Sequence, residues 1–293
     1  MIRLFLILII ALLAISFKGV CQEEVRDSLK TFRIETRDGN EYVGNILETD
    51  SIAFKFKTAN IGVISIFRTD IVRIKEIKQE QFKAGAFWFE NLQSTRYFWA
   101  PNGYGLKKGE AYYQNMWIFY NQAGYGFSNY FSVGAGMVPL FLFGGAPTPI
   151  WITPKFSIPL SSNKVNIGLG VLAATVMGTS NASFGIAYGV STFGSRDKNI
   201  SLGVGYGYAG GSWAKSPIFM GSTMIRTGKK GYFMSENYII HTDGEFGIIS
   251  MIGGRSLIKK VALDYGLVIP LFSEIEEFVA IPWLGFTIPI QSR

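Results

Sequence analysis

The sequence predicts an all-β protein in two parts, a small five-stranded β-barrel-like domain followed by a transmembrane antiparallel up-and-down β-barrel of about twelve strands. Three observations carry this prediction. The chain has 48% hydrophobic residues and 34 glycines but only 17% charged residues, whereas soluble domains have roughly 25%. Residues 111–154 and 165–195 contain no charge. Large apolar residues recur in these stretches at every second position, whereas a helix would scatter them around its circumference and would be destabilised by the glycines.

Residues 1–21 are predicted to be an export signal. Arg3 precedes an apolar run, Leu4–Phe17, and small residues follow it. This run is too short to cross a hydrocarbon core of about 30 Å comfortably, so an uncleaved anchor is the weaker alternative. We expect cleavage after Cys21, because Val20 is not the small residue that a lipoprotein signal requires there. Cys21 is the only cysteine, so the mature chain would form neither a disulfide nor a thiolate metal site.

Residues 22–77 are expected to form the small domain. Between Thr31 and Ile77, five short alternating runs are separated by Asp-Gly, Thr-Asp and Ala-Asn turn signals. The pattern from "DGNEYVGNI" to "IVRIKEI" resembles the Sm-like and SH3-like barrels of bacterial envelope proteins. The resemblance implies a periplasmic domain, with a periplasmic protein as a possible partner of residues 31–77. The polar stretch 78–85 is read as a linker, and residues 86–293 as the membrane barrel.

The strand pattern predicts which side chains face lipid. In 200–209 the large residues Ile200, Leu202 and Val204 alternate with serine and glycine. The same alternation occurs in 131–137, 165–171, 184–190 and 261–269. In an outer membrane the large residues would meet lipid, and the small and polar ones would line a narrow lumen. For 184–190 this places Phe184, Ile186, Tyr188 and Val190 against lipid.

Aromatic residues near the proposed strand ends are expected to form girdles at the membrane interfaces. They are Trp117, Tyr125, Tyr130, Trp151, Trp213, Tyr232, Tyr238 and Trp283.

The number of strands follows from the turns. Eleven strands can be read from Glu110 to the C-terminus, and single-chain bacterial barrels have even strand numbers. A twelfth strand is therefore expected within Ala86–Pro101, and "NGYGLKKGE" at 102–110 would be the first outward loop.

The stretch "TRYFWAPNGYGLKKGEAYYQN" at 95–115, with "WITPKFSIPL" and "GVSTFGSRDKNISLGVGYGY", resembles outer-membrane β-barrels of Bacteroidota whose activity is not characterised. The resemblance covers most of residues 90–290. It implies location and architecture, with outer-membrane lipid and lipopolysaccharide as the surroundings. The chain departs from barrels that end on an aromatic residue, because Phe286 is its last one.

Charged residues within strands are the best candidates for a site, because they are costly in a membrane unless they face the lumen and pair. Arg226, Glu236 and Asp264 are predicted to form a lumen cluster that guides a polar solute, or a salt-bridge plug that keeps the barrel closed. Asp264 falls on the strand face opposite the large residues Leu263 and Tyr265, which is the predicted lumen face. Glu236 shares the parity of large residues, which requires a reversed strand, a bulge or a position near the interface. The polar lumen candidates as a whole are Gln114, Asn166, Arg226, Glu236 and Asp264.

Two groups outside the strands are further candidates. Lys107, Lys108 and Glu110 are expected to contact lipopolysaccharide phosphates or an external partner, unless they form an ordinary solvated loop. Ser28 and Ser51 follow aspartates in a pattern that resembles Bacteroidota O-glycosylation sites, although an Asp-Ser turn explains both equally well.

The remaining classes are excluded or become alternatives. A net charge of +7 without a basic stripe argues against nucleic acid. No metal site or cofactor is expected, because the chain has one histidine and one cysteine. A lipid hydrolase would need His241 beside a serine such as Ser222 or Ser235; an exposed loop histidine is the plainer interpretation. The sequence thus predicts a non-enzymatic outer-membrane barrel, either a narrow solute channel or a structural, partner-binding envelope protein. A lipid hydrolase and a soluble exported β-sandwich are the alternatives.

Overall fold

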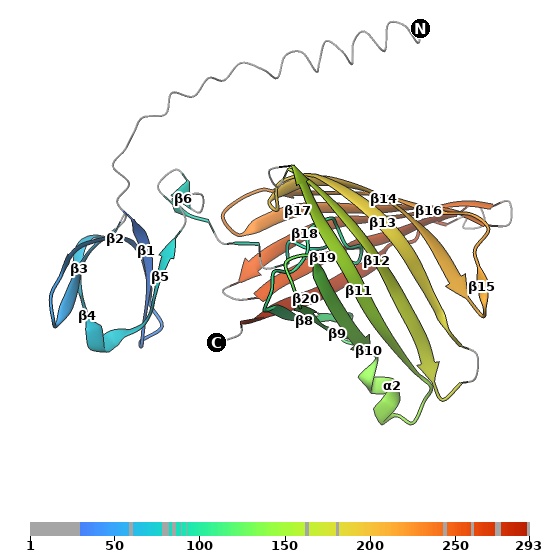
Figure 1. The fold of residues 1–293 in the computed structure, drawn as a ribbon, viewed down its shortest axis with the longest axis horizontal. Coiled ribbons are helices and arrows are strands. Elements are labelled where there is room, and N and C mark those ends of the chain that lie inside the picture. Colours follow the sequence, from blue (N-terminus) through green and yellow to red (C-terminus); the bar gives the residue numbers. More distant parts are fainter. Residues whose placement is uncertain are drawn as a thin grey trace, which may run out of the picture. The chain divides into compact units, whose positions relative to one another are not determined.

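A computed structural model describes residues 30–58, 61–77, 82–83, 86–88, 90–91, 93–161, 164–179, 182–242, 245–258, 261–272 and 277–291. The proposed signal segment, its cleavage site and Ser28 lie outside these residues. The chain divides into two compact units, residues 1–85 and 86–293, and Figure 1 draws the elements of each.

The first unit is a five-stranded antiparallel sheet, as the sequence predicts. Its strands are β1 (Thr31–Thr36), β2 (Glu41–Thr49), β3 (Ala53–Thr58), β4 (Gly62–Phe67) and β5 (Ile71–Ile77), with a 3₁₀ turn, η1, at Arg68–Asp70. The spatial order is β4-β3-β2-β1-β5, and the described residues show no pairing of β4 with β5. Alternating inward residues form a small core around Ile34, Phe56 and Ile66. The two-residue strand β6 (Phe82–Lys83) follows in this unit, and β7 (Ala86–Phe87) is the first strand of the second unit.

The second unit is a closed antiparallel barrel of twelve strands (Figure 1). In chain order they are β8 (Glu110–Met116), β9 (Tyr120–Gly126), β10 (Phe131–Met137), β11 (Thr148–Ser161), β12 (Val165–Met177), β13 (Phe184–Gly194), β14 (Lys198–Ala209), β16 (Ile218–Arg226), β17 (Gly231–Thr242), β18 (Glu245–Ile258), β19 (Val261–Phe272) and β20 (Ile281–Gln291). Consecutive strands pair, and β20 pairs with β8 to close the barrel. The strand count and the barrel are confirmed, and closure excludes the arrangement of two stacked sheets that a β-sandwich requires.

Two small elements lie in the connections between barrel strands. They are β15 (Ser212–Trp213), which pairs with the end of β14, and α2 (Pro139–Phe143), between β10 and β11. No helix among the described residues is long and apolar enough to cross a membrane.

The two ends of the barrel differ in their connections. At the end where β8 begins, which we call the turn end, the strands are joined by two to four residues. At the opposite end, the loop end, the connections reach ten residues at 138–147.

The position expected for the twelfth strand is wrong. All twelve strands lie after residue 109, and before it the described residues 90–91 and 93–109 contribute only an isolated bridge between Arg96 and Pro101. A strand boundary within 110–126 is hard to see in the sequence, because the turn between β8 and β9 lacks Gly, Pro, Asn and Asp. Trp117 and Ile118 form it at φ values of 48° and 67°, which are uncommon for large residues.

The alternation places most strands as predicted. In β14, Leu202 is 59% exposed on the outer face, whereas Ser201 is fully buried in the lumen. The outer faces of β12 and β19 likewise carry exposed Leu169, Tyr265 and Leu267.

For β13 the prediction is wrong, because its large residues face inward. Val190 is 3% exposed and lines the lumen with Ile186 and Tyr188. Small residues on neighbouring strands make the room: a Cβ on Gly205 would lie 2.8 Å from Ile186 Cδ1, and one on Gly170 would overlap the Tyr188 ring.

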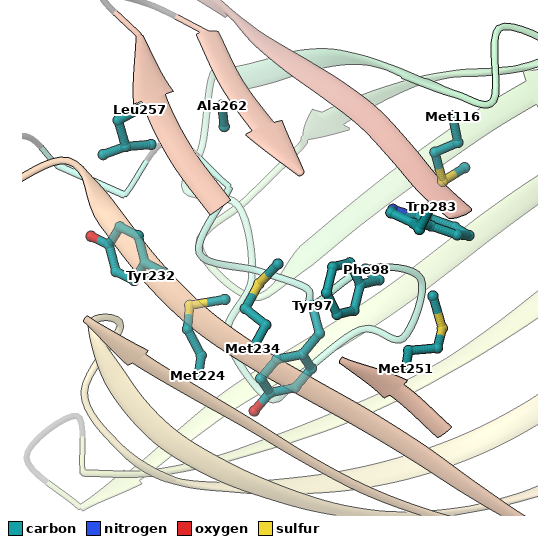
Figure 2. Packing of buried hydrophobic residues seen from close by; sticks show 10 residues of the cluster. All are labelled: Tyr97, Phe98, Met116, Met224, Tyr232, Met234, Met251, Leu257, Ala262 and Trp283. Atoms are coloured by element: carbon teal, nitrogen blue, oxygen red, sulfur yellow. The ribbon is translucent and has the colours of Figure 1, made fainter. Parts of the chain in front are cut away.

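The aromatic girdle is also only partly correct. Tyr125, Tyr130 and Trp213 are exposed. In contrast, Tyr232 and Trp283 are buried among lumen residues (Figure 2), and Trp117, Trp151 and Tyr238 line the internal cavity described below.

Candidate functional site: the lumen and its inner segment

The chain before β8 occupies the lumen of the barrel. We call residues 91–106 the inner segment; all of them except residue 92 are described. Tyr97, Phe98 and Asn102 are completely buried, although they belong to no strand. Figure 2 shows Tyr97 and Phe98 among Met234, Met251 and Trp283 of the barrel wall. Their burial is therefore against the inside of the barrel.

A buried ion pair on the wall holds the middle of the inner segment. Arg255 of β18 donates from Nε to Asp264 Oδ1 at 2.5 Å and from Nη2 to Asp264 Oδ2 at 2.9 Å. The same guanidinium donates to the backbone oxygens of Gln93 and Tyr97, the latter at 2.9 Å. Asp264 therefore orients an arginine whose remaining donors bind the inner segment.

A second wall residue, Glu236 of β17, holds the tip of the inner segment. Its carboxylate accepts the backbone N–H groups of Phe98, Trp99 and Ala100 at 2.9, 3.0 and 3.1 Å. Tyr238 Oη donates to the same carboxylate at 2.6 Å. Four donors around one carboxylate satisfy a charge that is fully buried.

Polar wall residues near the turn end bind the rest of the inner segment. Tyr97 Oη donates to Asn199 Oδ1 at 2.6 Å, and Gly103 N donates to Thr192 Oγ1 at 2.7 Å. Arg196, in the β13–β14 turn, donates to Ser94 Oγ at 2.6 Å. The inner segment is thus held by directed hydrogen bonds along its length.

The polar residues predicted for the lumen do not form one cluster. Gln114 is buried in the lumen and accepts a hydrogen bond from Arg96 Nη1 at 2.7 Å. Asn166 is buried, and its backbone would clash with any Cβ on Gly103 of the inner segment. Arg226 lies near the turn end and pairs with Asp197 at 2.9 Å. In the strand register Tyr232 stands between Arg226 and Arg255, the partner of Asp264.

The charged residues that the sequence analysis missed are Arg96, Lys155, Arg196 and Arg255. Lys155 and Arg255 both stand on inward positions of their strands. Lys155 shares its strand face with Thr153 and Ser157, which is a usable signal. Arg255 shares its face with Met251 and Leu257, so the alternation of large and small residues does not mark it as a lumen residue. Arg96 and Arg196 lie outside strands, where parity gives no information.

Lys107, Lys108 and Glu110 lie at the turn end. Lys107 N donates to Glu110 Oε2 at 2.8 Å, and Lys108 N donates to Asn129 Oδ1 at 3.1 Å. An external contact for these residues stays a prediction, and the short turns around them are typical of the periplasmic end of a barrel.

The other candidate residues, Ser51 and His241, are exposed. Ser51 is exposed in the β2–β3 turn, where the Asp50 carboxylate accepts the Ile52 and Ala53 N–H groups. His241 is exposed near the end of β17, and no hydrogen bond joins it to a serine within the described residues. In the same part of the chain, no three His, Cys, Asp or Glu side chains gather as metal ligands. Glycosylation of Ser51 remains a prediction.

Above the inner segment the lumen contains a cavity of about 610 Å³. Thr95, Arg96, Trp99, Ala100 and Pro101 contribute to its floor, and inward residues of the strands form its walls. Its lining is mainly apolar and aromatic, including Trp117, Met220, Ile249 and Val268. The lumen therefore has a half near the turn end, which the inner segment fills against polar and apolar wall residues, and a mainly apolar half toward the loop end.

No protein-family model matches the chain, and no curated protein matches its sequence. Two solved structures align with it, one described as "KdgM porin" and the other as "KdgM porin in complex with disordered oligogalacturonate". Their TM-scores are 0.45 and 0.44 at 10% sequence identity, over 61% of this chain and 98% and 96% of the porin chains. The fold described above rests on the strand pairing of the chain itself.

Proposed function

We propose that the protein is a non-enzymatic β-barrel of the outer membrane, a narrow solute channel that the inner segment holds closed. The location is supported by the closed barrel, whose backbone groups pair internally, and by its apolar outer face. The short turns argue that the turn end faces the periplasm. In this orientation the five-stranded unit, which precedes β8, is periplasmic.

One observation carries the channel proposal: on β8, β12, β13 and β14 the wall behind the inner segment is polar, although on β16 to β19 the inner segment packs against an apolar cluster. Gln114, Asn166, Thr192, Asn199 and Ser201 are all buried there. A permanently closed barrel could fill this half with apolar side chains, as the other half does. Hydrogen-bonding groups instead allow the wall to be wetted when the inner segment leaves, as conduction of a polar solute requires.

The test is conductance of the folded barrel with the inner segment weakened. The double variant Glu236→Gln/Arg255→Met removes the charges that bind residues 93 and 97–100. Lys229→Met, an exposed turn residue, is the control. We expect wild type, the double variant and Lys229→Met all to show a heat-dependent mobility shift on gels. Only the double variant should give frequent conductance steps in planar bilayers.

The outcomes separate the candidates. A heat-dependent shift without conductance in any variant would overturn the channel and leave a closed structural barrel. Absence of the shift, with the protein in the soluble fraction, would overturn the membrane location.

A structural, partner-binding role is the second candidate, and the five-stranded unit favours it. Exposed large apolar residues, Ile52, Val63, Phe67 and Val72, are 66%, 58%, 53% and 61% accessible. Such residues are typical of a protein-docking surface when they gather in one patch. Crosslinking in the cell envelope, with wild type and Val72→Asp compared, would test for a periplasmic partner. We expect a crosslinked species in wild type that is lost in the variant.

The lipid-hydrolase alternative depends on His241. Ser222 pairs with Glu236 in the β16–β17 register, and Ser235 binds Asn237, so neither is placed beside His241. Equal phospholipase activity of wild type and His241→Ala is the expected result.

A further inference from the structure

The cavity above the inner segment has the wrong polarity for a simple aqueous lumen. Interiors of membrane barrels that conduct polar solutes are polar. Here the inward residues of β13, β16, β18 and β19 that line the cavity are mainly apolar, among them Ile186, Met220, Ile249 and Val268. A lining of this kind excludes water and accepts apolar molecules. The cavity therefore suits an apolar ligand.

One wall of the cavity is aromatic. Trp283 lies 4.7 Å from Trp117 and 6.2 Å from Trp99 between ring centroids, and Tyr120 lies 5.8 Å from Trp99 and 6.1 Å from Trp151. These rings pack edge-on or tilted and present a continuous surface to the cavity. Such a surface can receive an extended hydrocarbon chain.

The floor of the cavity carries two basic side chains. Arg96 and Lys155 both line it. Arg96 binds Gln114 and the Tyr112 hydroxyl, and its Nε is buried without a hydrogen-bond partner. Lys155 Nζ donates to the Tyr104 backbone oxygen at 2.5 Å.

No carboxylate in the described part of the chain pairs with Arg96 or Lys155. Among the described lumen carboxylates, Asp264 is hydrogen-bonded to Arg255 and reaches Arg96 only through a longer-range electrostatic interaction, and Glu236 binds the tip of the inner segment. Arginine stays protonated in proteins, and a buried cation without a counter-ion is costly. An anionic group at this floor would remove that cost.

We propose that the cavity binds a long-chain monocarboxylate. Its carboxylate contacts Arg96 and Lys155, and its chain lies along the aromatic wall. The volume of 610 Å³ falls in the range of about 300–1,000 Å³ that pockets for single small organic molecules have, which favours one acyl chain over a two-chain lipid. Arg96 belongs to the inner segment and binds Gln114, so this site adjoins the polar wall that carries the channel proposal. Different readouts test the two proposals, ligand quenching for the site and conductance for the channel.

The experiment uses intrinsic fluorescence, because four of the six tryptophans line the cavity: Trp99, Trp117, Trp151 and Trp283. The probe is 9,10-dibromostearic acid, a bromine quencher, added to the full chain in nanodiscs. The uncharged comparison is methyl 9,10-dibromostearate. We expect saturable quenching by the acid.

Variants then separate the head from the tail of the ligand. Arg96→Met and Lys155→Met should each weaken binding of the acid about tenfold, the size expected for a charge-assisted hydrogen bond, and leave the ester unchanged. Ala174→Phe, which fills the cavity, should abolish saturable quenching by both. Lys108→Met, at an exposed lysine, should change neither. The heat-dependent mobility shift verifies that each variant is folded.

Three results would overturn the proposal. Quenching that Ala174→Phe does not reduce would mean that the probe only partitions into the bilayer. Equal binding of acid and ester in wild type would remove the carboxylate site. Tighter binding of a brominated phosphatidic acid than of the free acid would assign the cavity to a two-chain phospholipid instead.

Discussion

Arg255 and Asp264 stand opposite each other on β18 and β19, and their two-point contact lies inside the barrel with both side chains at most 1% exposed. Besides forming an ion pair, the two residues connect the barrel wall to the inner segment. Asp264 uses one edge of the guanidinium, and the other edge binds backbone oxygens of the inner segment. A wall charge thereby controls a segment that precedes it by more than 150 residues.

Asp264→Asn should destabilise the barrel and loosen the inner segment. The substitution leaves Arg255 buried without a full counter-charge, and breaking one side of a buried pair costs about 3–5 kcal/mol. The measurement is the free energy of unfolding in denaturant, followed by tryptophan fluorescence. A change within about 0.5 kcal/mol of wild type, the range of ordinary surface substitutions, would contradict this role.

The double variant Arg255→Met/Asp264→Leu separates the contribution of the pair to barrel stability from its binding of the inner segment. Replacing both charges by apolar groups is often neutral for stability. We therefore expect stability to recover relative to Asp264→Asn. The inner segment should stay loose, because the donors to residues 93 and 97 are gone. Proteolysis of residues 91–106 in the folded barrel measures the second effect, and protection equal to wild type would refute it.

Glu236→Gln should raise amide hydrogen exchange at Phe98, Trp99 and Ala100. A carboxylate accepts all three N–H groups, whereas an amide turns one donor of its own toward them. Hydrogen-exchange mass spectrometry of the intact protein reads this change peptide by peptide. Glu110→Gln, at an exposed glutamate of the turn end, is the matched control and should leave these amides protected.

Gly170→Ala should destabilise the barrel, whereas Gly221→Ala should not. A Cβ on Gly170 would overlap the Tyr188 ring and lie 2.9 Å from the Pro154 oxygen, but nothing lies within 4 Å of one on Gly221. Overpacking of this kind costs about 1–3 kcal/mol. Denaturant midpoints of the two variants provide the comparison, and equal midpoints would show that the wall yields to the added methyl group.

The five-stranded unit should lose stability in acid through Asp50. The backbone N–H groups of Ala53 and Ile52 hold the pKa of the Asp50 carboxyl below its usual value. The stabilisation is present above the unfolded pKa of about 3.9 and is lost as pH falls through the lower, folded value.

Asp50→Asn does not titrate, so its stability should depend less on pH in this range. The readout is the urea concentration that exposes residues 41–58 to protease in the intact protein at pH 6 and pH 3. A loss of the same size in wild type and variant would contradict the role of Asp50.

The sequence by itself determined the architecture and most of the wall. Period-two patterns predict the strands, because side chains of a strand alternate between its faces. The short turns, and the rule that single-chain barrels have an even number of strands, predicted a barrel of about twelve strands. The alternation of large and small residues placed Asp264 on the lumen face. Its partner could not be chosen, since register between β18 and β19 sets which residue stands opposite it.

Only the tertiary structure decided how the lumen is filled. Part of residues 91–106 was predicted to be a barrel strand because of its aromatic residues, but it forms no strand, and side chains of the barrel wall bind its backbone. Strand β13 turns its large residues inward, because glycines on β12 and β14 leave space for them. Neither fact is local: both depend on which side chains meet across a closed barrel, and sequence periodicity reports the two faces of a strand without naming what covers each one.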